Sequence, residues 1–477
     1  MTDVVKRSAW YLLAPIASSG IAIGLLPIAT RVLGPTEYGA LAIVLSISSL
    51  CVAAGSAVLG YVLPVHLLQA SGEKRQALLG SAVVGATAAS LVVGIVIVII
   101  IWVLPPSLEI GPQLKRGIAI CVSGAVLGAP WQVCGEMLML EGRASLYALG
   151  TVGQGIVNAL TVLAFLYLAP LPGYALYLGN FAGQLFLFVF AMRFLNGSMA
   201  VPRTDQWYEA MRKDVAACSA AAAAENGRTL FERIYLGMWT TVSEVGLLTH
   251  AQLYRNWVML GLNSVSKAVW PINLREAKVE NPDFVFTNAS WAVVQVGLAS
   301  VCVCFALFGR ELIAVLTNDK FFGAGTYALV LLCSLLIQTA GKPQMSLLVA
   351  RGHGARYAKI VTLATIAGVA ASALLVPYFG ALGVAWAAVL QYALMRILIV
   401  RASKSLITLP FRDGWVLFGA LATAGAYFWV ESMAPSVAIR LLLFAVFGGI
   451  AIALVRKQWA IFLDPERRMT LMSDYRT

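Results

Sequence analysis

Charged side chains are scarce in this sequence. Asp, Glu, Lys and Arg make up only 12% of the 477 residues, against about 25% in a soluble protein. Hydrophobic residues account for 60%, and the mean hydropathy is +0.83. This balance excludes a soluble enzyme and a disordered chain. It is typical of a helical membrane protein with many spans.

Residues and motifs for metal, redox and nucleotide chemistry are also few. The three histidines lie far apart, and the seven cysteines lie in apolar stretches without a CxxC pair. These patterns predict neither a metal site nor a disulfide. No Gly-rich loop leads to Gly-Lys-Ser/Thr, which excludes a Walker A ATPase. No loop is long enough for a ligase or glycosyltransferase domain, so we predict no cofactor and no enzymatic activity.

The net charge of +12 comes without long basic runs. A nucleic-acid-binding chain would cluster its Lys and Arg on one face or segment, so we predict no nucleic-acid partner. In a membrane protein the excess fits the preference of Lys and Arg for cytoplasmic loops. A smaller part of these Lys and Arg residues could line a cavity for an anionic substrate.

Apolar segments long enough to cross a bilayer alternate with short polar or Gly/Pro loops. The first follows Lys6-Arg7 and is predicted to be an uncleaved helix with a cytoplasmic start. We predict fourteen transmembrane helices, at 8–29, 40–67, 78–104, 116–140, 146–169, 173–193, 215–238, 245–271, 285–308, 324–349, 358–377, 381–400, 415–433 and 436–455.

The Lys and Arg distribution supports this topology. With a cytoplasmic N-terminus, 23 of the 34 basic residues fall in inner loops and helix ends and 6 in outer ones. The other five lie inside spans. Such a bias predicts that both termini are cytoplasmic.

Short matches at a constant offset indicate an internal repeat. Thr36-Glu37-Tyr38-Gly39 and Ser243-Glu244-Val245-Gly246 occupy matching places, and each joins a first and a second helix. We therefore predict two parallel six-helix lobes, with the substrate path between them. The predicted divisions are an N-lobe at 1–193, a cytoplasmic linker at 194–214, a C-lobe at 215–400, and two further helices with a tail at 401–477.

Ionisable residues inside spans are the first candidates for function, because each costs about 2.5–3.5 kcal/mol at mid-membrane. In the segment 215–238, Glu225, Arg228 and Glu232 share one helix face, and Arg233 follows. They could form a structural ion-pair network, or a charged cavity wall in which Glu225 or Glu232 takes up a proton. Both interpretations stay open for this segment.

Three further segments carry polar faces that could line a cavity for a polyhydroxylated ligand. Hydrogen bonding between helices is the alternative. The segment 245–271 contributes Gln252, Arg255, Asn256, Asn263 and Lys267, and 324–349 contributes Ser334, Gln338 and Lys342. The segment 146–169 contributes a stripe of Tyr147, Thr151, Gln154, Asn158 and Thr161.

One stretch also resembles a known family. Arg31-Val32-Leu33-Gly34-Pro35-Thr36-Glu37-Tyr38-Gly39 is similar to the Arg-x-Leu-Gly-Pro-x-x-Tyr-Gly signature of Wzx-type polysaccharide flippases. These belong to the multidrug/oligosaccharidyl-lipid/polysaccharide (MOP) exporter superfamily. Glu232-Arg233-Ile234, Glu244-Val245-Gly246 and Tyr378–Gly383 resemble later parts of the pattern, with Leu247 where a Tyr is expected.

The resemblance implies a transporter that moves a polyprenyl-diphosphate-linked oligosaccharide across a bacterial cytoplasmic membrane by alternating access. Its two lobes would form a V. Arg228, Arg233, Arg255 and Lys267 would attract the diphosphate, and the stripe with Tyr147, Gln154 and Asn158 would contact sugars.

Membrane lipids, and polymerase or chain-length proteins of the same pathway, would be the other partners. A lipid II flippase or a drug/cation antiporter of the same superfamily is the alternative. The antiporter is less expected, because the first span carries no Asp or Glu.

Overall fold

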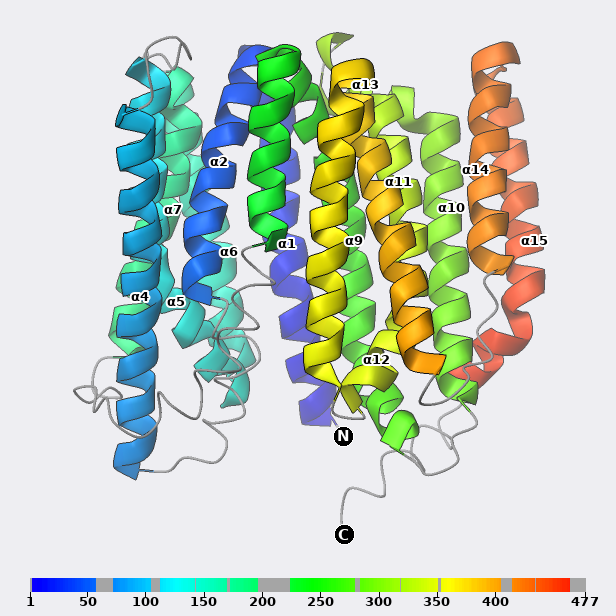
Figure 1. Cartoon of the computed structure of the whole chain (residues 1–477), viewed down its shortest axis with the longest axis horizontal. Helices are drawn as coiled ribbons and strands as arrows, with labels where there is room; N and C mark the ends of the chain where they lie inside the picture. Colours follow the sequence, from blue (N-terminus) through cyan, green and yellow to red (C-terminus); the bar gives the residue numbers. More distant parts are fainter. Residues whose placement is uncertain are drawn as a thin grey trace. The chain divides into compact units, whose positions relative to one another are not determined.

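The protein is described by a computed structural model that is built of helices (Figure 1). It describes residues 2–56, 72–103, 112–141, 143–169, 172–195, 224–278, 284–317, 319–350, 353–404, 414–433 and 435–463. Among these residues there is no β-strand. Eight of the described helices are long and apolar enough to cross a membrane. The all-helical, multi-span architecture predicted from composition is thus confirmed.

The first half of the described chain begins with α1 (Thr2–Val32), α2 (Pro35–Ser56), α4 (Gly72–Val103) and α5 (Pro112–Leu140). It continues with α6 (Ala144–Tyr167) and α7 (Pro172–Leu195). A further helix covers residues 224–239. The predicted linker lies almost wholly outside the described residues, and the predicted lobe bounds stay predictions.

The second half begins with α9 (Val242–Lys278) and α10 (Val285–Leu316), followed by the short 3-10 turn η2 (Asp319–Phe321). After it come α11 (Ala324–Ala340), α12 (Lys342–Ala350), α13 (Gly354–Lys404), α14 (Gly414–Met433) and α15 (Val437–Leu463). The chain separates into two compact units, residues 1–246 and 247–477.

Apolar packing between neighbouring helices holds the first unit together. Helix α5 packs against α2, α4 and α7, and α6 packs against α1 and α7. Trp131 of α5 stacks on Tyr147 of α6, with 5.9 Å between ring centroids. Because the lipid facing the other side of each helix is itself apolar, close side-chain fit rather than hydrophobicity sets these contacts.

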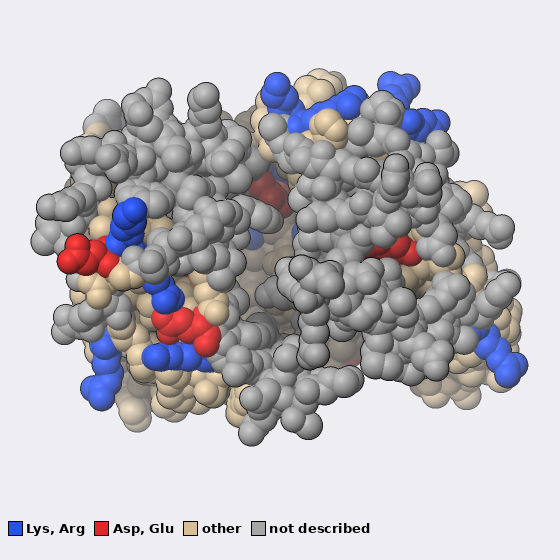
Figure 2. All heavy atoms as spheres, turned by 90° about the horizontal axis from the view of Figure 1, so that it is seen from below, with Lys and Arg blue, Asp and Glu red and all other residues tan. Residues whose placement is uncertain are grey.

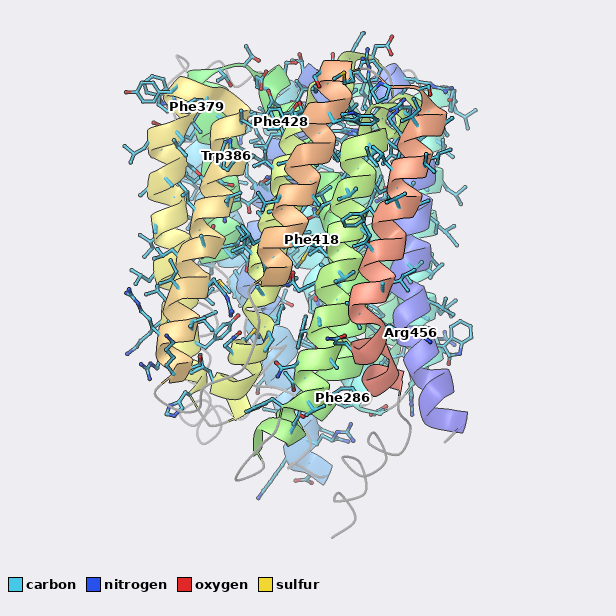
Figure 3. All side chains as sticks on the ribbon, turned by 90° about the vertical axis from the view of Figure 1, so that its right-hand side faces the viewer. Phe286, Phe379, Trp386, Phe418, Phe428 and Arg456 are labelled. Atoms are coloured by element: carbon cyan, nitrogen blue, oxygen red, sulfur yellow. The ribbon has the colours of Figure 1, made fainter. Side chains whose placement is uncertain are left out.

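Helix α10 is the centre of the second unit. It packs against α11, α14 and α15, and Figure 1 shows it between α11 and α14. The rings of Phe418 on α14 and Phe447 on α15 stack at 5.6 Å, and Figure 3 shows Phe418 partway along α14. The two helices beyond the predicted repeat are therefore packed onto this unit through α10.

Helix α13 contains the two spans predicted at 358–377 and 381–400. Its two arms meet at Gly380, where φ is 54°, a left-handed conformation that favours glycine. Pro377 precedes the bend and lacks the N–H that would continue the helix. Figure 3 places Phe379 beside this bend, at the opposite end of the unit from Phe286 of α10.

Candidate functional site

In the second unit, Arg255 of α9 is a predicted site residue whose positive charge contacts neutral groups. Its guanidinium donates to Gln338 Oε1 of α11 at 3.1 Å and to the Tyr392 hydroxyl of α13 at 2.8 Å. The charge also lies over the Tyr392 ring, 5.5 Å from its centroid. These three contacts are to neutral groups. Within the described chain, the positive charge of Arg255 is therefore not neutralised by a carboxylate.

Helix geometry gives the positions of Arg255, Gln338 and Tyr392 along their helices. At the α-helical rise, Arg255 lies about 20 Å along the axis of α9 from the start of that helix at Val242. Gln338 lies in the last turn of α11, just before the chain turns into α12, and Tyr392 lies midway along the second arm of α13. The spans predicted at 245–271, 324–349 and 381–400 contain these three residues, so the predicted topology places all three inside the membrane.

The other predicted residues of the same set have different surroundings. Asn256 is exposed, and Lys342 is half-buried at the start of α12. Asn263 and Lys267 lie on α9, but their side chains are outside the described residues. The structure therefore joins Arg255 to Gln338, and it adds Tyr392, which the sequence pattern had not identified.

In the first unit, two of the charged residues predicted at 215–238 form an ion pair with each other, and a third is exposed. Arg228 Nε donates to Glu232 Oε1 at 2.6 Å, and Glu232 is only 2% exposed. Glu225 is exposed. The Arg228–Glu232 contact is the structural ion pair considered from the spacing, and proton uptake by Glu225 or Glu232 stays a prediction.

Arg233 connects the helix over residues 224–239 to α2. It donates to the carbonyl oxygen of Ala42 at 2.6 Å and to the hydroxyl of Ser46. In this arrangement its hydrogen bonds go to protein groups inside the first unit. Its predicted role in substrate binding stays a prediction.

The polar stripe on α6 lies against α7. A Cβ atom on Gly179 would be 2.6 Å from Asn158 Oδ1, and one on Gly183 would be 3.2 Å from Gln154 Cγ. Glycine on α7 therefore makes room for these amides. Tyr147, at the start of the stripe, stacks on Trp131. These contacts fit the interhelical alternative, and sugar contact by Gln154, Asn158 and Tyr147 stays a prediction.

The starts of α2 and α9 meet at two repeat-related glycines, all within residues 1–246. A Cβ on Gly39 would be 2.0 Å from the Val242 oxygen, and one on Gly246 would be 2.0 Å from the Pro35 oxygen. Pro35 and Val242 are related by the same sequence offset as Gly39 and Gly246. Each glycine thus contacts the residue that corresponds, in the other repeat segment, to the contact of its partner. Such a reciprocal contact is what two-fold symmetry between two segments produces.

A buried carboxylate at the end of α9 was not predicted from the sequence. Glu276 accepts hydrogen bonds from the backbone N–H of Phe286 at 3.1 Å and of Thr287 at 2.8 Å. It also accepts from the Thr287 hydroxyl at 2.5 Å. An acidic group at a helix N-terminus is stabilised by the unpaired N–H groups and the helix dipole. Because it comes from the preceding helix, no local capping motif indicates it.

Charged side chains also gather at helix ends, and Figure 2 shows basic and acidic groups side by side on one end face. In the first unit, Glu141 pairs with Arg75 of α4 at 2.9 Å and with Arg143 at 3.2 Å. These three residues lie in loops or terminal turns that the Lys and Arg distribution assigns to the inner side. Exposed pairs of this kind contribute little to stability. Among the described residues, no group of three His, Cys, Asp or Glu could hold a metal ion.

The chain is similar in fold to solved membrane transporters. The lipid II flippase MurJ, in an inward closed conformation, superposes with a TM-score of 0.73 at 10% identity, over 96% of this chain and 99% of the other. The chain has this transporter fold. An inward-facing multidrug resistance MATE family transporter of the MOP superfamily gives a TM-score of 0.64 at 15% identity, covering 88% of this chain and 98% of the other. No family model and no curated protein matches the sequence.

The comparison confirms the predicted fold class. The described residues form helices without strands, eight of these helices are long and apolar enough to cross a membrane, and the fold matches that of the solved transporters over most of both chains. Both solved relatives are described as a flippase or a transporter rather than an enzyme. At these identities the likeness concerns the fold, so the predicted site residues stay predictions.

Proposed function

We propose that the protein is a Wzx-type flippase. It moves a polyprenyl-diphosphate-linked oligosaccharide, such as an O-antigen, capsule or exopolysaccharide repeat unit, across the bacterial cytoplasmic membrane. Both termini lie in the cytoplasm, and the protein works beside the polymerase and chain-length proteins of the same pathway. The MOP-type fold and the signature around Arg31 and Gly39 support this proposal.

The observation that carries the proposal is the environment of Arg255. A mid-membrane arginine costs about 2.5–3.5 kcal/mol on insertion scales. Its partners Gln338 and Tyr392 satisfy hydrogen bonds but leave a positive charge. A diphosphate would neutralise that charge through bidentate hydrogen bonds, which suit the planar guanidinium. The neutral amide and hydroxyl beside it would also hydrogen-bond a sugar attached to the diphosphate.

The mechanism follows from these groups. In the inward-open state Arg255, helped by Lys267, attracts the diphosphate while the lipid tail stays in the membrane. Lobe rocking then exposes the headgroup to the outer side. The cycle is driven by an ion or proton gradient, with Glu225 or Glu232 as the coupling carboxylate, or by the membrane potential, which supplies about 2.3 kcal/mol per charge per 100 mV.

A lipid II flippase is the second candidate, because the fold likeness to MurJ extends over 96% of this chain. Its substrate is also a lipid diphosphate that carries sugars, so Arg255 would serve equally well. A drug/cation antiporter is less well supported. Its cationic substrate would be repelled by Arg255, and residues 8–32 of the first span contain no Asp or Glu.

Deletion of the gene in the native host tests the proposal. We expect loss of one surface glycan, accumulation of its lipid-linked repeat unit at the inner face, and a viable cell. Loss of viability with accumulation of lipid-linked peptidoglycan precursor would support the lipid II alternative. Unchanged glycans with altered drug sensitivity would refute both.

Complementation with point variants then tests the site. Arg255→Gln should abolish export at normal protein level, and Arg255→Lys should restore part of it because the charge returns without the bidentate geometry. Arg401→Gln is the matched control, since Arg401 is exposed in the last turn of α13. Full export by the Arg255→Gln variant would refute the proposal that Arg255 binds the diphosphate.

A further inference from the structure

The two helices beyond the repeat form one wall of a cavity in the second unit. The cavity has a volume of about 420 Å³ and lies among α10, α11, α14 and α15. It is lined by the last turns of α10, the end of α14, and the first turns of α11 and α15. The predicted topology assigns all four of these helix ends to the outer side of the membrane. A volume of this size is within the range of small-molecule sites.

An ion pair forms the polar floor of this cavity. Arg440 of α15 donates to Glu311 Oε1 at 2.6 Å and to the carbonyl oxygen of Leu307 at 2.8 Å, both on α10. Its guanidinium also lies over the Phe308 ring at 5.6 Å. These contacts fix Arg440 in place. The Glu311 side chain is 44% exposed, and Arg440 occupies only one of its two carboxylate oxygens, Oε1.

Aromatic rings and hydroxyls complete the lining. Arg310 lies over the ring of Phe322, with 5.4 Å to the centroid. The hydroxyls of Tyr427 on α14 and Thr326 on α11 are 3.3 Å apart. Glu431, the fourth charged residue of the lining, is exposed at the end of α14. The cavity thus combines apolar ring faces with groups that can donate or accept hydrogen bonds.

The charges of this lining decide which ligands it suits. Two arginines and two glutamates balance, so neither an anion nor a cation meets a net opposite charge. A phosphate would also have to compete with Glu311 for Arg440, and at neutral pH it offers few donors for Glu311 Oε2. A neutral sugar offers both hydrogen-bond donors and acceptors. Its hydroxyls donate to the carboxylate and accept from the guanidinium, and its C–H face packs on an aromatic ring.

We propose that this cavity is a saccharide-binding subsite, formed on the outer side by α10, α11 and the added helices α14 and α15. It holds a neutral sugar of the translocated glycan through Glu311, Arg310 and Tyr427. This inference rests on the proposed function, because a flippase releases its glycan on this side. It also gives the added helix pair a specific role in release of the substrate.

Binding to the purified full-length protein in lipid nanodiscs tests the proposal. The probes are neutral monosaccharides and short oligosaccharides obtained by partial acid hydrolysis of the host's surface polysaccharide. Inorganic phosphate and tetraethylammonium serve as charged comparators. Saturation-transfer NMR should show transfer to the sugars that saturates with concentration, with no competition from either comparator.

Two variants assign that binding to the cavity. Glu311→Gln removes the charged acceptor, and Tyr427→Phe removes only a hydroxyl and so keeps the fold. Each should weaken sugar binding, Glu311→Gln by about tenfold, because hydrogen bonds to a charged group are the stronger kind. Tyr378→Phe is the matched control, since Tyr378 is 82% exposed at the bend of α13.

Three results would overturn the subsite. These are no saturable sugar binding, sugar binding that neither variant changes, and binding of phosphate or tetraethylammonium that the two variants reduce. The gene deletion separates this failure from failure of the proposed function. Export without sugar binding here refutes only the subsite, whereas saturable sugar binding together with unchanged surface glycans refutes only the flippase.

Discussion

The reciprocal contact between Gly39 and Gly246 leads to a quantitative prediction. A Cβ at either position would lie 2.0 Å from a backbone oxygen, whereas real Cβ atoms essentially never approach a neighbour within 3.0 Å. An alanine must therefore push the starts of α2 and α9 apart by about an ångström, since backbone atoms cannot rotate away. Overpacking of this kind costs about 1–3 kcal/mol, and we expect each single variant near the upper end.

The double variant distinguishes this mechanism from ordinary local strain. Because one movement of the helix starts makes room for both methyl groups, Gly39→Ala and Gly246→Ala together should cost little more than either alone. The coupling energy should be about 1–3 kcal/mol, in the range found for residues in direct contact. Independent strain at two sites would instead give costs that add.

The measurement is the free energy of unfolding of the full chain in mixed micelles, for the four proteins of this cycle. Gly261→Ala is the matched control on α9, because a Cβ there meets nothing within 4 Å. It should change stability by at most about 1 kcal/mol, the difference in helix propensity. The reciprocal contact would be refuted if Gly39→Ala lowered the free energy of unfolding no more than this control. It would also be refuted if the losses of the two single variants simply added in the double variant.

Three further changes test other parts of the structure, with unfolding in mixed micelles as the measurement. Glu232→Gln leaves Arg228 with a buried charge and should cost about 3–5 kcal/mol, while replacing both residues by Met should recover most of it; equal costs would contradict a buried pair. Glu276→Gln weakens the N-terminal cap of α10 and should cost about 1–2 kcal/mol, so an unchanged stability would show that the cap is dispensable. Gly380→Ala forces a left-handed φ on a residue with a side chain and should cost about 1–2 kcal/mol, and no loss would mean that the bend relaxes.

Much of the fold could be predicted from composition and pattern, because a bilayer restricts the choice. Only helices and closed barrels satisfy backbone hydrogen bonds in lipid, and the apolar segments have helical length. The break between the arms of α13 was also predictable from Pro377 and Gly380, since both act on the local backbone. The repeat that relates Gly39 to Gly246 was visible for the same reason: a constant offset is a property of the chain itself.

The candidate site was predictable only in part. The sequence identified Arg255 as an expensive mid-membrane charge, and it put Gln338 on a polar face of another segment. It gave no means of joining the two, because contact between helices depends on their rotation and relative height. Tyr392 was missed for that reason, as was Glu276, which caps a helix other than its own.

The sequence alone therefore determined that this chain is a helical membrane protein with a repeat and a few costly charges, since hydropathy and periodicity act along the chain. Only the tertiary structure decided which groups meet across helices. It gave Arg255 neutral neighbours on two other helices and placed Glu311 and Arg440 together in one cavity. Electrostatic energy depends on distance in space, and no spacing along a sequence specifies that distance between helices.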